Sequence, residues 1–204
     1  MATKVDLKKE LSELYRPSAK EVSLVDVPPM NFLMIDGQGD PNTSKDFQVA
    51  VEALYGLSYT LKFMLKKTAP EHDYTVMPLE GLWWTEGTEG FDAEHKETWL
   101  WTLMIMQPEH ITGEHVMEAA AQLKEKKDPH LLDRVRFERF DEGPTLQIMY
   151  IGPYAEEGPT IEKLHQYARE HGYSLAGKHH EIYLGDPRRT APEKLKTIIR
   201  HPVK

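Results

Sequence analysis

Apolar residues recur every three or four positions in several stretches of the chain, which is the pattern of helices that bury one face. The longest stretch begins near Ser44 and continues for about six turns at roughly 3.6 residues a turn. Its apolar stripe consists of Phe47, Ala50, Val51, Leu54, Ser58, Leu61 and Leu65. Shorter helices are predicted over residues 4–15, 113–127 and 160–171, and Pro17 ends the first of them.

Segments with strand composition lie between these helices. The segments 135–140 and 145–150 flank a turn-like Asp-Glu-Gly-Pro sequence, so we expect them to form a hairpin. Residues 98–106 are apolar at both alternating sets of positions, which indicates a strand that is covered on both faces or faces a ligand on one. Strands are predicted at residues 22–27, 31–35, 74–84, 98–106, 135–140, 145–150, 181–184 and 195–203.

The same order of elements occurs twice, over residues 21–108 and 133–204, with a linking helix at about 112–128 between them. Repeated units usually stack so that each buries the apolar face that the other leaves open. We therefore predict an α+β fold in which two pseudo-symmetric strand-helix-strand-strand repeats form an antiparallel sheet. The helices should lie on one face, with a ligand cleft between the repeats. Residues 1–20 are expected to add an N-terminal docking helix.

Composition excludes several classes of protein. The formal net charge is -8, and the basic residues are scattered among more numerous acids, which argues against a nucleic-acid partner. The absence of cysteine excludes disulfides, thiolate catalysis and cysteine-ligated zinc. No apolar run approaches the roughly 20 residues that cross a bilayer. The N-terminus lacks the apolar region of a secretory signal, so we expect a cytoplasmic protein without a membrane partner.

Carboxylates are the first candidates for chemistry. Glu181 and Tyr183 are two residues apart in a predicted strand and therefore share one face. A carboxylate that faces an aromatic cleft is desolvated, which raises its pKa and makes it a base for water or an attractor for a cation. From spacing alone, a solvent-facing glutamate at a sheet edge is the favoured interpretation. Glu80 is the counterpart of Glu181 in the first repeat, and it lies either in a loop or at the rim of the pocket. If both acids face one cleft, one would act as a base and the other would stabilise charge.

Aromatic residues gather near the predicted strand ends, where each offers a flat surface with a polar tip that suits polycyclic ligands. Ordinary core packing explains several of them. Trp99 and Trp101 share one strand face, so the sequence leaves open which of them reaches a ligand. The residues predicted to bind the ligand, together with Glu80, are Tyr55, Trp83, Trp101, Tyr154 and Tyr183.

Two groups of histidines suggest a metal site at first sight, one at His179-His180-Glu181 and the other at His110 with Glu114-His115. Neither is an H-E-x-x-H helix or a spaced set of three ligands on one element. We therefore interpret them as solvated loop histidines and predict no metal and no cofactor. The serines lie outside any nucleophile-elbow motif, which argues against serine catalysis.

The second repeat resembles a known family in four places. These are Gly152-Pro153-Tyr154, a helix ending near Gly172-Tyr173, Glu181-Ile-Tyr-Leu-Gly-Asp-Pro187, and the terminal His201-Pro-Val-Lys204. Together they resemble the GyrI-like small-molecule-binding domain, which also forms the effector-binding half of multidrug-responsive transcription regulators. The resemblance covers residues 22–204 and implies a ligand held against aromatic walls and a buried glutamate, to which Glu181 corresponds. Some 20 residues precede the first strand, too few for a helix-turn-helix, so we expect a standalone member.

Standalone members of that family include a gyrase-inhibitory protein and a group that hydrolyses strained cyclopropane rings of DNA-alkylating natural products. The long first helix, the Leu82-Trp83-Trp84 run and the Trp-rich strand resemble the hydrolytic group more closely. We therefore expect a bacterial detoxifying protein that binds an aromatic hydrophobic compound and hydrolyses it. Glu181 would activate water and Tyr150 would polarise the carbonyl of the ligand. The alternatives are non-catalytic binding or sequestration of cationic drugs, and gyrase inhibition.

The predicted partner is thus a polycyclic or cationic small molecule. The sequence leaves open the identity of this molecule, whether it reacts, and the oligomeric state, with a homodimer as one alternative.

Overall fold

The computed structural model of the protein describes residues 4–87, 95–127 and 129–204. Residues 1–3 of the expected docking helix and residue 128 of the expected linking helix lie outside the described part. Eight strands form one sheet in which neighbouring strands are antiparallel. The strands are β1 (Ser23–Val27), β2 (Met30–Gln38), β3 (Leu79–Trp84), β4 (Leu100–Gln107), β5 (Arg136–Phe140), β6 (Gly143–Ile151), β7 (His179–Tyr183) and β8 (Lys196–Pro202). The predicted α+β class with an antiparallel sheet is confirmed.

The strand order is β1-β6-β8-β7-β3-β4-β2-β5. Strands β1 to β4 of the first repeat correspond to β5 to β8 of the second. When each strand is replaced by its counterpart and the order is read from the other end, the same order results. β3 and β7 lie side by side at the centre, so each repeat contributes one of the two middle strands. The expected hairpin of residues 135–140 and 145–150 is wrong, because β5 pairs with β2 while β6 pairs with β1 and β8. Each repeat sends one strand across to cover the backbone edge of the other, which protects that edge from non-specific pairing.

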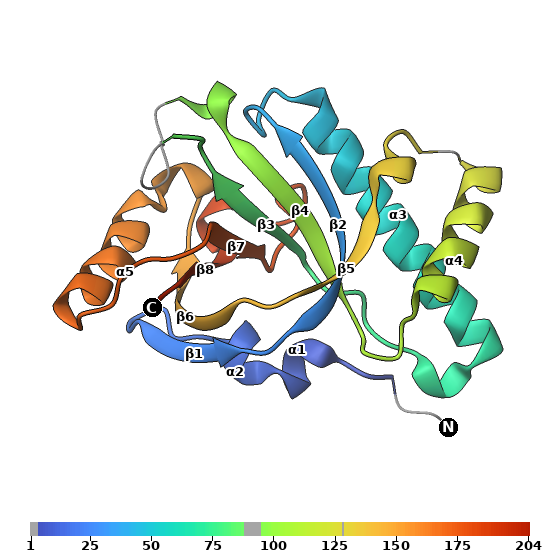
Figure 1. The fold of residues 1–204 in the computed structure, drawn as a ribbon, viewed down its shortest axis with the longest axis horizontal. Helices are drawn as coiled ribbons and strands as arrows, with labels where there is room; N and C mark the ends of the chain where they lie inside the picture. Colours follow the sequence, from blue (N-terminus) through green and yellow to red (C-terminus); the bar gives the residue numbers. More distant parts are fainter. Residues whose placement is uncertain (1–3, 88–94, 128) are drawn as a thin grey trace.

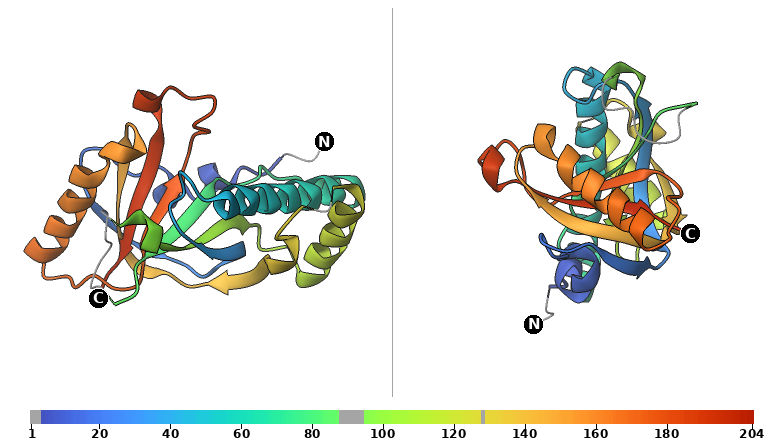
Figure 2. Two further views of the ribbon diagram at one scale, coloured as in Figure 1. Left: turned by 90° about the horizontal axis from the view of Figure 1, so that it is seen from above. Right: turned by 90° about the vertical axis from the view of Figure 1, so that its left-hand side faces the viewer.

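The helices are α1 (Leu7–Glu10), α2 (Ser12–Tyr15), α3 (Lys45–Thr68), α4 (Gly113–Lys126) and α5 (Gly158–Glu170). The long helices α3 and α5 lie on one face of the sheet, as expected, and the short N-terminal helices lie on the other. α5 and α3 lie toward opposite ends of the sheet and α4 packs beside α3 (Figures 1 and 2). The expected docking helix consists of two short helices, α1 and α2, which lie near β1 (Figure 1). None of the described helices is both long and apolar enough to cross a membrane.

The position of α3 follows from its first turn and its apolar stripe. The side chain of Ser44 caps the helix by accepting a hydrogen bond from the backbone N–H of Phe47, at 3.3 Å. The ring of Phe47 then stacks on Trp83 and meets Trp101 edge-on, with centroid distances of 6.0 and 5.3 Å. A Cβ at Gly37 would lie 2.1 Å from the Trp101 ring, so glycine is what lets this indole lie against β2. These contacts place α3 over β3 and β4.

Candidate functional site

Glu181 is the centre of a buried polar cluster on β7. Residues alternate between the two faces of a strand, so His179, Glu181 and Tyr183 share one face. This is also the face of Trp83 and therefore of α3, because Trp83 is paired with His179 across β3 and β7. Nε2 of His179 lies 2.9 Å from Oε1 of Glu181, and the Tyr183 hydroxyl donates to Oε2 at 2.8 Å.

These donors decide the ionisation of Glu181. Burial raises the pKa of its carboxyl. The hydrogen bond and charge of His179 and the hydrogen bond of Tyr183 lower this pKa, and together they outweigh burial. The net pKa lies below its ordinary value, whereas the sequence predicted a raised one. The prediction took account of desolvation alone, because the sequence does not show that His179 and Tyr183 donate to the two carboxylate oxygens of Glu181. Glu181 is consequently a carboxylate at neutral pH.

Aromatic side chains extend this cluster through Tyr183. The indole N–H of Trp83 donates to the Tyr183 hydroxyl at 3.0 Å, so a relay of hydrogen bonds runs from Trp83 through Tyr183 to Glu181. Tyr154 packs edge-on against the Tyr183 ring at 5.6 Å. Gly81 pairs with Glu181 across the strands, and a Cβ there would lie 2.7 Å from the indole nitrogen of Trp83. We call Glu181, His179, Tyr183, Trp83, Tyr154 and the adjacent Glu157 the Glu181 site.

The other residues predicted for ligand contact on this face differ in their surroundings. The Tyr55 hydroxyl accepts a hydrogen bond from the backbone N–H of Leu79, which precedes Glu80 in β3, and the Tyr55 side chain is partly exposed. Trp101 is the cross-strand partner of Trp83 and is buried. Tyr150 donates its hydroxyl proton to the Pro153 carbonyl oxygen at 2.9 Å and packs against the apolar cluster under α5. Its catalytic role therefore stays a prediction.

The expected meeting of Glu80 and Glu181 in one cleft is not observed. Gly81, not Glu80, pairs with Glu181, and Glu80 pairs with Ile182. A shift of one residue moves a side chain to the other face of a sheet, so the two acids point in opposite directions. Glu80 is fully buried and accepts a hydrogen bond from the hydroxyl of Tyr15, in α2, at 2.8 Å.

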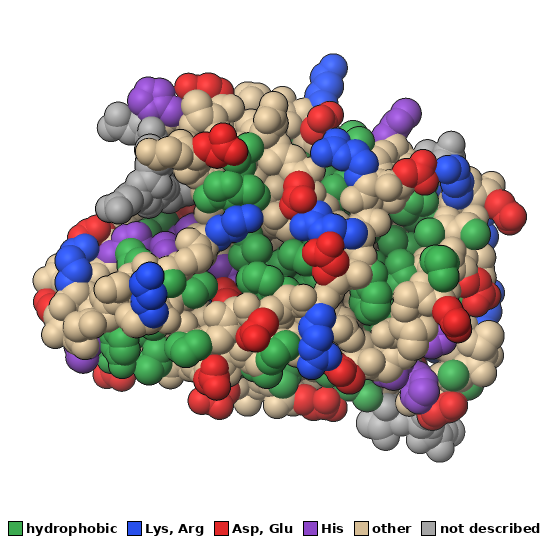
Figure 3. All heavy atoms as spheres, viewed as in Figure 1, with side chains coloured by type: hydrophobic (Ala, Val, Ile, Leu, Met, Phe, Trp, Pro, Cys, Tyr) green, Lys and Arg blue, Asp and Glu red, His purple; other side chains and the backbone are tan. Residues whose placement is uncertain are grey.

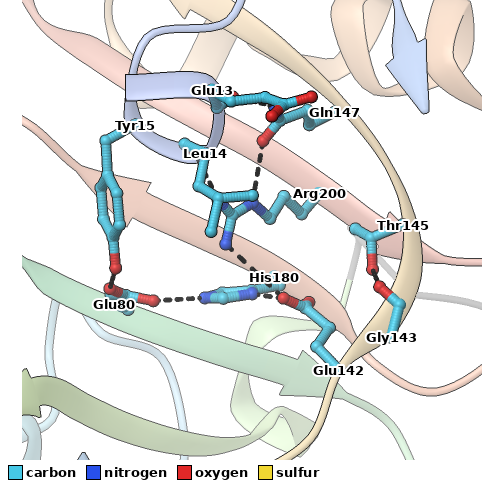
Figure 4. Close-up of polar contacts among 10 residues, drawn as sticks. All are labelled: Glu13, Leu14, Tyr15, Glu80, Glu142, Gly143, Thr145, Gln147, His180 and Arg200. Carbon is cyan, nitrogen blue, oxygen red and sulfur yellow. Dashed lines mark hydrogen bonds and ion pairs between the residues drawn. The ribbon is translucent and has the colours of Figure 1, made fainter. Parts of the chain in front are cut away.

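On this second face, opposite the Glu181 site, lies a buried network of charged groups. Figure 4 shows its members. His180 lies between two carboxylates, with Nε2 3.0 Å from Oε2 of Glu80 and Nδ1 2.7 Å from Oε1 of Glu142. Both ring nitrogens therefore act as donors, which is the pattern of an imidazolium. The interpretation of His179 and His180 as solvated loop histidines is wrong, because both are buried in a central strand.

Arg200 completes this network and ties the N-terminal segment to the sheet. It is fully buried, lies 3.6 Å from a carboxylate oxygen of Glu142, and donates to the side chain of Gln147 and to the carbonyl of Leu14. Through Tyr15 and Leu14, α2 is held to Glu80 of β3 and Arg200 of β8, the two strands that flank β7 (Figure 4). The network thus fixes the strand that carries Glu181.

Replacing Tyr15 with Phe should lower the free energy of unfolding by about 1–3 kcal/mol, because the variant leaves the buried Glu80 carboxylate without one of its donors. Urea unfolding followed by circular dichroism measures this change. Tyr59→Phe is the matched control, since the Tyr59 side chain is exposed on α3. Equal stability of the two variants would contradict a structural role for the Tyr15–Glu80 bond.

Stability should also depend on pH through His180. Burial alone would lower the pKa of this imidazole, but Glu142 and Glu80 raise it from its ordinary 6.5 to about 9. A raised folded-state pKa means that the stabilisation is fully present below 6.5 and is lost as the pH rises through about 9. The free energy of unfolding should therefore fall across this alkaline range by urea titration. His180→Gln should lose this component; an identical decline in both proteins would contradict it.

A separate hollow of about 510 Å³ lies at the ends of β2 and β3 and the start of β4, with Asp36, Trp84, Arg134, Arg136 and Lys178 in its wall. Its cations contact protein groups: Arg136 binds the Asp36 carboxylate, Arg134 the Asp36 carbonyl, and Lys178 lies 3.2 Å from the centre of the Trp84 ring. Figure 3 shows basic and acidic side chains interspersed over one face of the molecule. Among the described residues, no three His, Asp or Glu side chains are grouped to hold a metal ion.

Comparisons with known proteins agree with this fold. The model of the GyrI-like small molecule binding domain matches residues 20–204. An uncharacterized conserved protein from Listeria innocua has a structure 42% identical in sequence, with a TM-score of 0.91, and the match covers 98% of this chain and 100% of that one. A search of curated proteins found no match.

Two further structures from Listeria innocua are described as hydrolases. One is 40% identical with a TM-score of 0.88, covering 99% of this chain and 100% of its own. The other is 38% identical with a TM-score of 0.86, covering 98% of this chain and 100% of its own. The similarity therefore extends over the N-terminal helices as well as the domain.

Proposed function

This chain belongs to the GyrI-like small-molecule-binding domain family, and we propose that its Glu181 site binds a flat aromatic compound and adds water to it. The observation that carries the proposal is the buried carboxylate of Glu181, which accepts from Tyr183, while Tyr183 in turn contacts Trp83 and Tyr154. An ionised carboxylate can accept a proton from water at neutral pH. The two similar proteins described as hydrolases support the same class of reaction.

The aromatic residues favour a flat and largely apolar ligand. Trp83 is buried, whereas Tyr55, Tyr154 and Tyr183 are partly exposed. Rings of this kind supply large contact areas with little loss of side-chain freedom, and their hydroxyl groups bind polar edges of a ligand. A polycyclic compound placed between these rings would bring its reactive carbon toward Glu181.

The proposed substrate contains a strained three-membered ring conjugated with a carbonyl group. Glu181 takes a proton from water, the water oxygen bonds to a ring carbon, and a carbon–carbon bond of the ring breaks. The released electron pair moves through the conjugated system to the carbonyl oxygen, which then gains a proton. General-base assistance contributes roughly 10²–10⁴ in rate, which relief of ring strain makes sufficient. Hydration of this kind would detoxify a DNA-alkylating compound.

A three-compound panel tests the proposal. The purified protein is incubated with a neutral polycyclic cyclopropane whose strained ring is conjugated with a carbonyl group, with its ring-opened analogue and with a polycyclic cation. The products are separated and their masses are measured by mass spectrometry. We expect the cyclopropane to gain one water and the other two compounds to be recovered unchanged. Recovery of the intact cyclopropane at the rate of the protein-free control would contradict hydrolysis.

Binding without chemistry is the second candidate function. The charge of Glu181 next to the faces of Trp83 and Tyr183 is an arrangement that attracts organic cations. In that case the cation of the panel should bind tightly, and Glu181→Gln should weaken it far more than a neutral ligand of the same shape. Isothermal titration calorimetry with this matched ligand pair distinguishes the two candidates.

A further inference from the structure

Glu157 is a second carboxyl group in the Glu181 site that the sequence did not single out. It lies directly before α5, and its side chain is hydrogen-bonded to that of Glu181. Two ionised carboxylates have acceptors but no donor, so a hydrogen bond between them requires one proton. Two such groups in contact also repel each other when both are charged, which keeps one of them protonated. The pair therefore holds a single proton at neutral pH.

The surroundings assign that proton to Glu157. Both oxygens of Glu181 already receive hydrogen bonds, from His179 and from Tyr183. Oε2 of Glu157, in contrast, is buried without a hydrogen-bond partner among the residues that the structure describes. Burial and then the charge of Glu181 raise the pKa of Glu157 to about 9, while that of Glu181 stays low.

The other charged and titratable groups near the pair do not reverse this assignment. Lys96, in the short helix before β4, lowers the pKa of Glu157, but by less than burial and Glu181 raise it. Burial raises the pKa values of Tyr154 and Tyr150, so both remain neutral at pH 7. On β7, Tyr183 is likewise neutral because its pKa lies well above 10, and His179 donates to Glu181.

We propose that Glu157 is the general acid of the Glu181 site and protonates the ligand oxygen that becomes negative when water adds. This inference rests on the proposed hydration. As the ring bond breaks and its electron pair reaches the carbonyl oxygen, the Glu157 O–H bond breaks and that oxygen takes the proton. Glu181 is then protonated and Glu157 ionised. Proton transfer through their shared hydrogen bond restores the starting state, so one water is consumed and no other reactant.

This division of roles specifies the substrate class. A substrate needs an oxygen acceptor conjugated to the strained ring and placed near Glu157, with the ring carbon near Glu181. A strained hydrocarbon without that oxygen gives the electron pair no acceptor that Glu157 can protonate. The site should therefore bind such a hydrocarbon without hydrating it.

Glu157→Gln tests the assignment through the pH dependence of turnover of a cyclopropane substrate. The wild-type kcat should fall as the pH rises through about 9, where Glu157 loses its proton. Glu157→Gln should reduce kcat by about 10² or more with KM unchanged, and this alkaline decline should disappear. Glu157→Asp keeps an acid and should retain the decline, and Glu156→Gln, on the exposed neighbour, should behave as wild type.

The outcomes separate this role from the hydration itself. A Glu157→Gln variant with the wild-type kcat and the same alkaline decline would overturn the general-acid role and leave hydration by Glu181 standing. A wild-type protein that converts none of the substrate would overturn the proposed function and the acid role together. Retention of the native circular dichroism spectrum by Glu157→Gln distinguishes a lost proton donor from a misfolded protein.

Discussion

Glu181→Gln is expected to lower turnover of a cyclopropane substrate by roughly 10²–10⁴, because the amide cannot accept the proton of the attacking water. The substitution preserves shape, and the amide oxygen still accepts from Tyr183. The dissociation constant for a neutral ligand should therefore be unchanged. Steady-state kinetics combined with calorimetric titration of an unreactive analogue measures both quantities.

Glu125→Gln is the matched control, since it makes the same chemical change on the exposed surface of α4. It should leave both turnover and affinity as in the wild type. Wild-type turnover in Glu181→Gln would show that another group activates the water. A loss of neutral-ligand affinity equal to the loss of turnover would instead indicate that Glu181 acts in binding.

The second large effect concerns stability. His180→Leu should lower the free energy of unfolding by about 3–5 kcal/mol, because removing one partner of a buried ionic group leaves the others uncompensated. Glu80 loses the imidazolium, and Glu142 retains the more distant Arg200. Urea or thermal unfolding measures this loss.

Ile182→Val provides the control, because Ile182 is the next residue on the same face of β7 and is equally buried. It should cost about 0.5–1.5 kcal/mol, the usual range for this change in a core. Adding Glu80→Gln and Glu142→Gln to His180→Leu removes the uncompensated charges and should recover part of the stability. If His180→Leu costs no more than Ile182→Val, the network does not contain a charged histidine.

The periodicity of apolar residues predicted individual helices and strands correctly where their formation depends on neighbouring residues in the chain. The periodic stripe of α3 and the alternation of Glu181 and Tyr183 both appear in the structure, because helix and strand periodicities are set by backbone geometry. The predicted hairpin of residues 135–140 and 145–150 was wrong because strand pairing between the two repeats depends on residues that are far apart in the sequence. Nothing between residues 140 and 145 encodes the crossing of β5 to β2.

The site was predictable in part for the same reason. Strand alternation placed Glu181 and Tyr183 on one face, and the pairing of β3 with β7, which the sequence did not show, brings Trp83 to them. Glu80 was matched with Glu181 by order along the chain, and a one-residue difference in register placed it on the opposite face. Glu157 lies in a Gly/Pro loop, where no periodicity shows which way a side chain points.

The buried histidines show a further limit of pattern-based reasoning. His179 and His180 were interpreted as solvated because histidine is polar and the motif lacked metal-ligand spacing. Burial of His180 depends on Glu80 and Glu142, which are distant in sequence and become its neighbours only in the folded sheet. Tyr15 joins the same network from the N-terminal segment.

The most direct test of the central claim is a reaction of the wild-type protein with a cyclopropane substrate in ¹⁸O-labelled water, with mass analysis of the product. If the Glu181 site adds water to the strained ring, the product carries one ¹⁸O atom, and Glu181→Gln forms it at a rate lower by roughly 10² or more. Recovery of unchanged substrate, or a product without the label, would contradict hydration at this site.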